Sequence, residues 1–459
     1  MMEAFLQRSA IPHYTPESPN FGFHQGSYSG VHQDKKASIV VLPETPKQVA
    51  ETVKQAVATN LPVVVRGGGH DPYGRWTVAG AILLDLRNLN RVTVDFESQT
   101  ARVYGGTTMV KVLEVLKQHG FQAAASACAT VGYTGWALVG GMGPFMSSYG
   151  LGADQIVGAE VVDANGELVE ADERLLKGLR GGGGSLAIVT ELVIKIYPLM
   201  EIQAGILIYD SADMRKTIYN VFTKFAALLH DYHDKLPSKL AVLPGVLMMP
   251  NLGPVAGAII IWNGPADDES KAWIGRIANL AHLMPGTPGA DTAITTTTAY
   301  DFFTHLNTML PATVTGKCHT ATVSSFTPEV IANLAESAAT IPAGFTGGMN
   351  MHILRADSPS CSDHVPASVL PYRKPHIMLE ILGYGSDEES SKQAARWALE
   401  TRNRFFASED SMRGTYLPLT APEFLDLDET YGDNLAELKR IKAEVDPNGV
   451  FKHTVPALI

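Results

Sequence analysis

A short glycine-rich stretch, Arg66-Gly-Gly-Gly-His70, constrains the fold of this chain more than any other feature. Three β-branched residues, Val63 to Val65, come directly before it and predict the end of a buried strand. The glycines can turn the chain with no Cβ in the way, and consecutive backbone N–H groups in such a loop form a concave anion site. Arg66 adds a permanent positive charge beside it. The stretch predicts either a tight turn with a surface histidine or a cradle for a phosphate-bearing ligand.

Three more glycine-rich segments, at 132–143, 150–152 and 181–184, favour the second interpretation. One glycine turn is routine, but four in one region can all bring backbone close to a ligand. From Gly120 to Ala153 the chain carries no charged residue, yet glycines and a proline interrupt the apolar residues before they could span a membrane. We interpret this region as backbone packed around a large, extended cofactor that contains phosphate.

The overall composition limits the partners. The 459 residues carry a net charge of −11, which argues against nucleic acid and anionic membranes. The three cysteines, Cys128, Cys318 and Cys361, do not form a disulfide framework, and sparse Cys/His pairs predict no metal site. The N-terminal residues have no apolar core of a signal peptide, and no Asn-x-Ser/Thr sequon occurs. We therefore expect a cytoplasmic protein.

Hydrophobic periodicity predicts an α+β chain. Residues 1–37 are expected to form an arm with turns. Residues 38–198 are expected to form a unit rich in short strands, with helices at 45–59 and 109–119 and an Asn165-Gly166 hairpin. From about residue 200, strands alternate with long helices such as 214–230 and 388–406, which suggests an antiparallel sheet backed by helices. A last helix is expected between 431 and 451.

Several motifs, taken in order, carry a resemblance to a known family. They are Arg66-Gly-Gly-Gly-His70, Leu84-Asp-Leu86, Cys128-Ala-Thr-Val-Gly132, Gly140-Gly-Met-Gly143, Tyr149-Gly-Leu-Gly-Ala-Asp154, Arg180-Gly-Gly-Gly-Gly184, Ile188-Val-Thr190, Tyr431-Gly-x-Asn434 and Asp446-Pro-Asn-Gly-Val-Phe451. Along nearly its whole length the chain resembles the berberine bridge enzyme-like group of the vanillyl-alcohol-oxidase flavoproteins, which is related to 6-hydroxy-D-nicotine oxidase.

The resemblance implies FAD, bound by a PCMH-type domain of two subdomains. This domain would comprise residues 1–200, with its core at 38–198, and a C-terminal return at 416–459; residues 201–415 would bind substrate. His70 matches the histidine that the family joins to the flavin 8α-methyl group, and Cys128 the cysteine that some members join to flavin C6. The implied cofactor-binding residues are Arg66, Gly67, Gly68, Gly69, His70, Asp71, Cys128, Thr130, Val131, Gly135, Gly140, Gly141, Gly143, Tyr149, Gly150, Asp154, Ile188 and Tyr416.

The catalytic base departs from the family pattern. In plant members a glutamate follows a Gly-Gly pair by seven residues and acts as the base, whereas here the same count from Gly348 lands on Arg355. The family's Tyr-x-Asn-Tyr contact to flavin is Tyr416-Leu-Pro-Leu419, without the asparagine. A histidine or an activated tyrosine could replace the base, although each could equally be a structural residue. The candidates are Tyr73, His352, Tyr372, His376 and Glu380.

The resemblance implies an FAD-linked oxidase that removes hydride from a small-to-medium organic molecule, such as a secondary-metabolite intermediate. Val131 matches a position where a small residue leaves room for O2 beside the flavin, which favours reduction of O2 to H2O2. The missing base also supports an alternative, a flavin-containing cyclase that catalyses a net non-redox reaction of the Diels–Alder kind. The identity of the substrate and the oligomeric state stay open.

Overall fold

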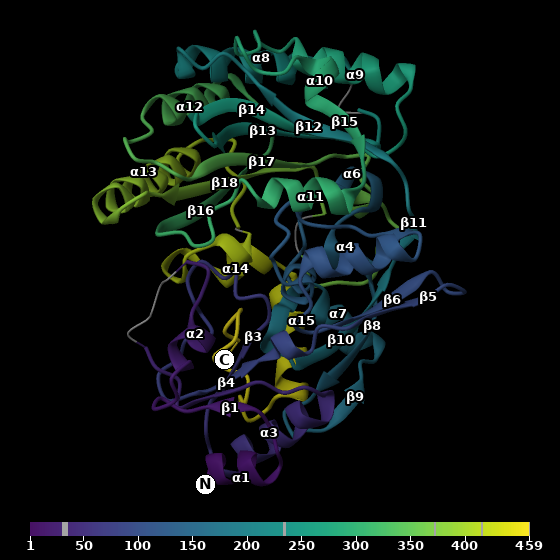
Figure 1. The fold of residues 1–459 in the computed structure, drawn as a ribbon, viewed down its shortest axis with the longest axis vertical. Coiled ribbons are helices and arrows are strands. Elements are labelled where there is room, and N and C mark those ends of the chain that lie inside the picture. Colours follow the sequence, from purple (N-terminus) through teal and green to yellow (C-terminus); the bar gives the residue numbers. More distant parts are fainter. Residues whose placement is uncertain (30–34, 233–235, 371–372, 415, 459) are drawn as a thin grey trace.

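A computed structural model describes residues 1–29, 35–232, 236–370, 373–414 and 416–458. Figure 1 shows two bodies, one above the other, with both chain termini in the lower one. The lower body contains a four-stranded and a five-stranded sheet and is called here the two-sheet unit. The upper body contains a seven-stranded sheet and is called the seven-stranded unit. These sheet compositions support domain boundaries near residues 200 and 415, which we keep as a proposal.

The first sheet of the two-sheet unit places the glycine-rich stretch. Its order is β1-β2-β4-β3, and β3 runs parallel to β4, with Arg66 opposite Asp85. The crossover helix α3 begins at Pro46. Thr45 caps its N-terminus, because the side chain of Thr45 accepts a hydrogen bond from the backbone N–H of Gln48. Its buried face packs on the sheet, so the glycine loop leaves a rigid strand end. The bounds are β1 (His13–Tyr14), β2 (Ile39–Val41), α3 (Pro46–Ala58), β3 (Val63–Arg66) and β4 (Ile82–Asp85).

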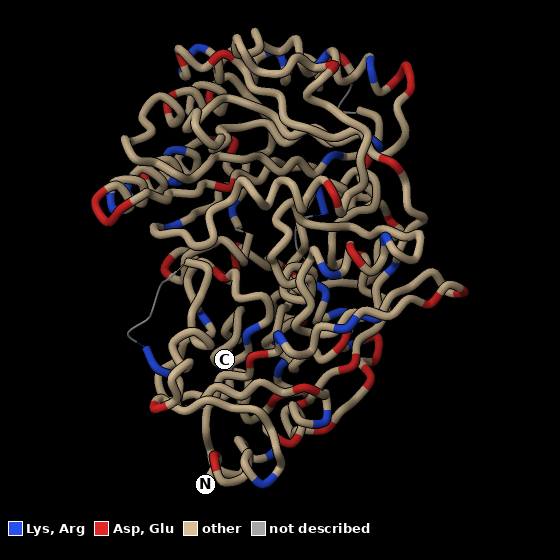
Figure 2. Tube along the Cα trace, in the orientation of Figure 1, with Lys and Arg blue, Asp and Glu red and all other residues tan. Residues whose placement is uncertain are grey.

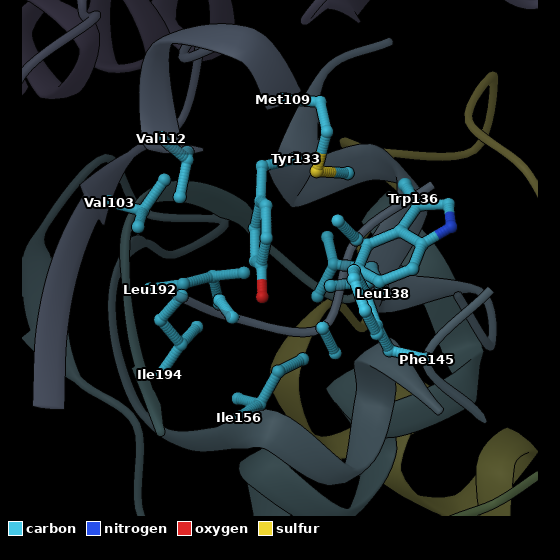
Figure 3. Close-up of a cluster of buried hydrophobic side chains, with 14 of the residues drawn as sticks. Val103, Met109, Val112, Tyr133, Trp136, Leu138, Phe145, Ile156, Leu192 and Ile194 are labelled. Atoms are coloured by element: carbon cyan, nitrogen blue, oxygen red, sulfur yellow. The ribbon is translucent and has the colours of Figure 1, made fainter. Parts of the chain in front are cut away.

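The second sheet is antiparallel in the order β5-β6-β10-β8-β9. Figure 3 shows the core beside it, where the ring of Tyr133 points into a cluster with Val103, Val112 and Leu192. Tyr133 begins helix α5, so this core fixes the end of the preceding loop that carries Cys128. The bounds are β5 (Val92–Asp95), β6 (Thr100–Tyr104), α4 (Met109–Gln118), α5 (Tyr133–Leu138), β8 (Ile156–Val162), β9 (Leu168–Glu170), α7 (Glu173–Gly182) and β10 (Ile188–Lys195).

The C-terminal segment returns to the two-sheet unit. The hydroxyl of Tyr431 donates a hydrogen bond of 2.8 Å to the carbonyl of Gly181 in α7. A buried ion pair joins Lys442 to Asp446 at 2.5 Å, and the same carboxylate accepts the backbone N–H groups of Val450 and Phe451. The Asp446-Pro-Asn-Gly motif therefore ends a helix and fixes the last turn. The helices are α14 (Leu427–Tyr431) and α15 (Asn434–Val445).

The seven-stranded sheet is antiparallel in the order β15-β12-β14-β13-β17-β18-β16. Helices α8, α9, α12 and α13 bury one face of it, and Figure 1 shows α8, α9 and α12 on the side away from the two-sheet unit. The opposite face turns toward that unit. The bounds are β12 (Ile202–Ile208), α8 (Met214–Asp231), β13 (Leu240–Met249), β14 (Gly253–Trp262), α9 (Asp268–Ala278), β15 (Ile294–Thr297), β16 (Gly316–Val323), α12 (Pro328–Ala339), β17 (Gly348–Leu354), β18 (His376–Tyr384) and α13 (Glu388–Phe406).

Several elements differ from the expectation. Strands β13, β15, β16 and β17 were not expected; β13 contains Pro244 and Gly245, which are unusual inside a central strand. The helix expected between 431 and 451 is α15, and a separate short helix, α14, precedes it, with Gly432 (φ of 50°) between the two. The remaining short elements are α1 (Met2–Arg8), α2 (Phe21–Gln25), β7 (Phe121–Gln122), α6 (Met146–Tyr149), β11 (Tyr197–Pro198), α10 (Ala290–Ala293) and α11 (Ala299–Asn307).

Figure 2 shows acidic and basic residues interspersed over both units. Within the described ranges, none of the helices has the length and apolar character needed to cross a bilayer.

Candidate active site

A cavity of about 420 Å³ is lined by residues from both units. The two-sheet unit contributes the glycine loop, His70 and Cys128, and the seven-stranded sheet contributes His352 and Glu380. Residues 416–419 and 453–455 of the C-terminal return complete the lining. The volume falls in the range of small-molecule and cofactor sites. The cavity therefore brings the two proposed flavin-linking residues and two of the catalytic candidates together.

The glycine loop after β3 leaves no room for larger residues. A Cβ on Gly68 would lie 2.3 Å from the backbone nitrogen of Gly132, so these two loops cross in close contact. Gly69 has a φ of 78°, and a Cβ there would lie 2.7 Å from the guanidinium of Arg66. Arg66 lies beneath the loop, outside the cavity lining, and donates a hydrogen bond of 2.7 Å to the carbonyl of His24. Burial lowers its pKa to about 10, still far above neutral pH.

His70 follows the loop and is held as a neutral imidazole. Burial, together with the positive charge of Arg66, lowers its pKa to about 4. The ring of Tyr28 stacks on the imidazole, with ring centroids 4.4 Å apart and an interplanar angle of 21°. A neutral imidazole has a free lone pair on one nitrogen, as a nucleophile requires.

Cys128 lines the same cavity from the loop before α5. Burial raises the pKa of its thiol, while the hydroxyl of Thr130, 3.6 Å from Sγ, opposes this effect. Cys128 is therefore mainly a thiol at neutral pH. Thr130 is exposed and does not line the cavity, whereas Val131, Gly135 and Ile188 do.

Glu380 and His352 face the cavity from adjacent strands. Nε2 of His352 lies 3.7 Å from Oε2 of Glu380, and Nδ2 of Asn350 donates to that same oxygen at 3.1 Å. Burial by itself raises the pKa of Glu380, but His352 and Asn350 more than offset it, so the net pKa is lowered. Glu380 is therefore an ionised, half-buried carboxylate that can accept a proton.

The other catalytic candidates lie outside the main cavity. The Tyr73 hydroxyl donates to the carbonyl of Cys318, and burial raises the pKa of Tyr73 well above its usual value. His376 is buried beside a smaller cavity of about 60 Å³, with Nδ1 2.8 Å from the carbonyl of Lys374. Tyr372 lies outside the described residues. The family-count position, Arg355, is buried against the carbonyls of residues 236, 237 and 240 and does not reach the main cavity.

Three predicted cofactor residues connect the two units instead of lining the cavity. Asp154 pairs with Arg373 at 2.6 Å and accepts a hydrogen bond from Ser360. A Cβ on Gly150 would lie 2.7 Å from the hydroxyl oxygen of Ser360. The hydroxyl of Tyr149 accepts hydrogen bonds from Gln122 and Asn263. These contacts join the two units, and the role of the three residues at the cofactor stays a prediction.

Of the remaining residues predicted to bind the cofactor, Asp71 and Tyr416 line the cavity, and three glycines lie behind its lining. Asp71 lines the cavity and accepts a bond of 2.6 Å from Arg75, whose guanidinium also donates to the carbonyls of Leu417 and Pro418. Tyr416 lines both the main and the smaller cavity. The glycines behind the lining allow close backbone contacts; these are Gly140 beside Tyr416, Gly141 against Gly152 and Gly143 against Ala125.

The lining fits a polar, extended cofactor. Nε1 of Trp76 and Oγ1 of Thr134 are buried, line the cavity and have no hydrogen-bond partner among the residues that the structure describes. Buried polar atoms normally have a hydrogen-bond partner, so these two groups are suited to donating hydrogen bonds to a ligand in the cavity. The sequence motifs did not identify Trp76, Thr134, Arg75 or Asn350. Among the described residues, no group of three or more His, Cys, Asp or Glu could hold a metal ion.

Comparisons with known proteins agree with this geometry. The family model "FAD binding domain" matches residues 37–172, and "Berberine and berberine like" matches residues 424–456. FAD-linked oxidoreductase aurO of Gibberella zeae is 30% identical over 462 residues, covering 96% of this chain and 84% of that protein. (R)-6-hydroxynicotine oxidase of Paenarthrobacter nicotinovorans is 33% identical over 188 residues, covering 40% of this chain and 41% of that protein.

Solved structures share the fold. Berberine bridge enzyme from Eschscholzia californica superposes with a TM-score of 0.84 at 19% identity, covering 100% of this chain and 99% of that one. 6-Hydroxy-D-nicotine oxidase from Arthrobacter nicotinovorans gives a TM-score of 0.79 at 20% identity, covering 97% of both chains. The predicted α+β class with a PCMH-type domain is confirmed. The chain belongs to the berberine bridge enzyme-like family of FAD-linked oxidoreductases.

Proposed function

We propose that this oxidoreductase is an oxidase whose FAD is joined covalently to His70 and, through a second bond, to Cys128. Its substrate is a small-to-medium organic molecule, such as a secondary-metabolite intermediate, and O2 is the electron acceptor. One observation carries the proposal: His70 and Cys128 line the same cavity as the Glu380–His352 pair. Linking groups and a proton acceptor thus face one space from opposite units.

His70 is suited to the first bond because its imidazole is neutral at physiological pH. Cys128 is less suited to the second bond, since burial raises the pKa of its thiol and so disfavours the reactive thiolate. The second bond therefore needs removal of the thiol proton, which Thr130 favours by lowering the pKa. We expect the histidyl bond to form over a wider pH range than the cysteinyl bond.

Glu380 is the residue we assign to receive the substrate proton. Its carboxylate is kept ionised by His352 and Asn350, and it lies on the cavity side of β18. Met378, two residues earlier on the strand, gives the cavity an apolar wall that would hold an organic ring or chain. Bound FAD supplies acceptance of hydride and transfer of two electrons to O2.

Val131 supports the use of O2. It is half-buried, lines the cavity, and is small enough to leave space beside the linking residues. A small electron acceptor such as O2 could reach the reduced cofactor beside Val131. We infer production of H2O2.

The decisive experiment mixes the purified protein with candidate substrates without oxygen and records the visible flavin band. The oxidase proposal expects bleaching, followed by recovery of the band and release of H2O2 when air is admitted. Product formed without bleaching and without H2O2 would contradict it and would favour the cyclase alternative. Acid precipitation tests the linkage, since a His70→Ala, Cys128→Ala double variant should release all its flavin.

A further inference from the structure

Tyr28 lies against the proposed flavin-linking histidine. Its ring stacks on His70 at 4.4 Å between centroids. Its backbone N–H donates a hydrogen bond of 3.2 Å to the carbonyl of Gly69, and its carbonyl accepts one of 3.0 Å from the N–H of Val314. Tyr28 is thus fixed to the glycine loop on one side and to the seven-stranded unit on the other.

The environment of Tyr28 is apolar and close to other reactive groups. Its side chain packs on a cluster that contains Val314, Cys318 and Tyr384. Burial, with smaller contributions from Cys128 and Glu380, raises the pKa of its hydroxyl to about 12. The hydroxyl therefore keeps its proton at physiological pH, and the ring acts on His70 by contact and by excluding water.

We propose that Tyr28 is a positioning residue for His70: its stacked ring fixes the imidazole plane and keeps one ring face dry for the covalent bond to FAD. The inference rests on the proposed function. Joining the imidazole nitrogen to the flavin methyl carbon breaks one C–H and one N–H bond, and O2 takes up the two electrons and two protons as H2O2. A ring that can rotate or become protonated forms this bond more slowly.

The N-terminal arm, residues 1–37, contains a second stacked pair that serves as a matched control for loss of a ring. Tyr14 stacks on His24 with centroids 4.0 Å apart and an interplanar angle of 18°. Tyr14→Ala removes a similar contact from the same arm without touching His70. Tyr28→Phe retains the ring at His70, and Tyr28→Leu retains apolar volume without an aromatic face.

The experiment supplies FAD and air to the purified variants and follows the fraction of flavin that survives acid precipitation, with time, between pH 5 and 8. Tyr28→Phe and Tyr14→Ala should form the bond within about twofold of the unmodified protein, and Tyr28→Leu and Tyr28→Ala about tenfold more slowly. The pH profile of the two slow variants should move upward, because a hydrated imidazole regains its ordinary pKa.

The Cys128→Ala background isolates the histidyl bond in each variant. Unchanged rates and pH profiles in Tyr28→Leu and Tyr28→Ala, with no bond in His70→Ala, would overturn the role of Tyr28 and leave the proposed function intact. Equal slowing in Tyr14→Ala would also overturn it, because the effect would then come from loosening of the arm. Acid-stable flavin in His70→Ala, Cys128→Ala would instead contradict the proposed linkage itself.

Discussion

Oε2 of Glu380 lies 3.7 Å from Nε2 of His352. The register of β17 and β18 creates this pair, because Asn350 lies directly opposite Glu380 and His352 follows two residues later on the same face. The three polar side chains therefore gather on the cavity side of a sheet whose other face is apolar. Partly burying three polar side chains costs free energy, which favours a functional role for this group.

Replacement of Glu380 by Gln should slow the reductive half-reaction by a factor of about 10²–10⁴, the usual contribution of a positioned acid or base. Acid-stable flavin should be unaffected, since Glu380 belongs to the opposite unit. The measurement is the rate of anaerobic flavin bleaching with substrate. Glu191→Gln is the control, because Glu191 is a buried strand carboxylate that pairs with Arg102 and does not line the cavity. An unchanged bleaching rate in Glu380→Gln would remove this residue from the mechanism.

Replacement of His352 by Ala should move the acid limb of the pH–rate profile to higher pH. His352 lowers the pKa of Glu380, so its loss raises that pKa, and the carboxylate is then protonated at a higher pH. A proton acceptor works only above its pKa, which fixes the direction of the shift. The profile of kcat/KM against pH reports it. A limb that stays in place or moves to lower pH would show that Glu380 does not set it.

Because the two glycine loops cross in close contact, we predict that Gly68 cannot be replaced by a residue with a Cβ without loss of stability. A Cβ there would lie 2.3 Å from the nitrogen of Gly132, so Gly68→Ala must displace backbone and should destabilise the fold by about 1–3 kcal/mol. Gly275→Ala is the control, because Gly275 lies in helix α9 with open space at its Cβ, and it should be neutral or stabilising. Thermal unfolding distinguishes the two. Equal melting temperatures for Gly68→Ala and the unmodified protein would contradict the close packing.

Sequence patterns were most informative where local chemistry decides the structure. The strand before Gly67 follows from its β-branched residues, the Asn165-Gly166 hairpin from its turn residues, and helix α3 from its hydrophobic periodicity and proline start. Motif order also predicted the fold, which is confirmed, and the roles of His70 and Cys128 at the cofactor, which stay a prediction. These features depend on neighbours in the chain, which a single sequence displays.

Long-range pairing was harder to predict. Strand β17 begins Gly-Met-Asn-Met-His, in which apolar and polar residues alternate, but so short an alternation does not show which strands pair with it. The sequence therefore did not single out Asn350, although its side chain donates a hydrogen bond to Glu380. Asp154, a motif residue expected at the cofactor, pairs with Arg373 across the units, and its role at the cofactor stays a prediction. Only the tertiary structure separates packing from ligand binding at such positions.

The last prediction concerns acid stability and His319 in strand β16. His319 is 2% exposed, and burial, together with the charges of Arg402 and Lys317, lowers its pKa to about 4. The unfolded chain has the ordinary histidine pKa of about 6.5 and binds the proton more readily between those two values. The free energy of unfolding should therefore fall as the pH is lowered from about 6.5 to about 4, by about 2 kcal/mol from this residue.

His319→Gln removes this proton linkage, so its free energy of unfolding should depend less steeply on pH in that window, whatever its absolute value. Urea unfolding at a series of pH values between 4 and 7 measures the slope. His305→Gln serves as the control, because His305 is exposed on helix α11 and its replacement should leave the slope of the unmodified protein. An identical slope in His319→Gln and the unmodified protein would show that this imidazole is not held neutral by burial.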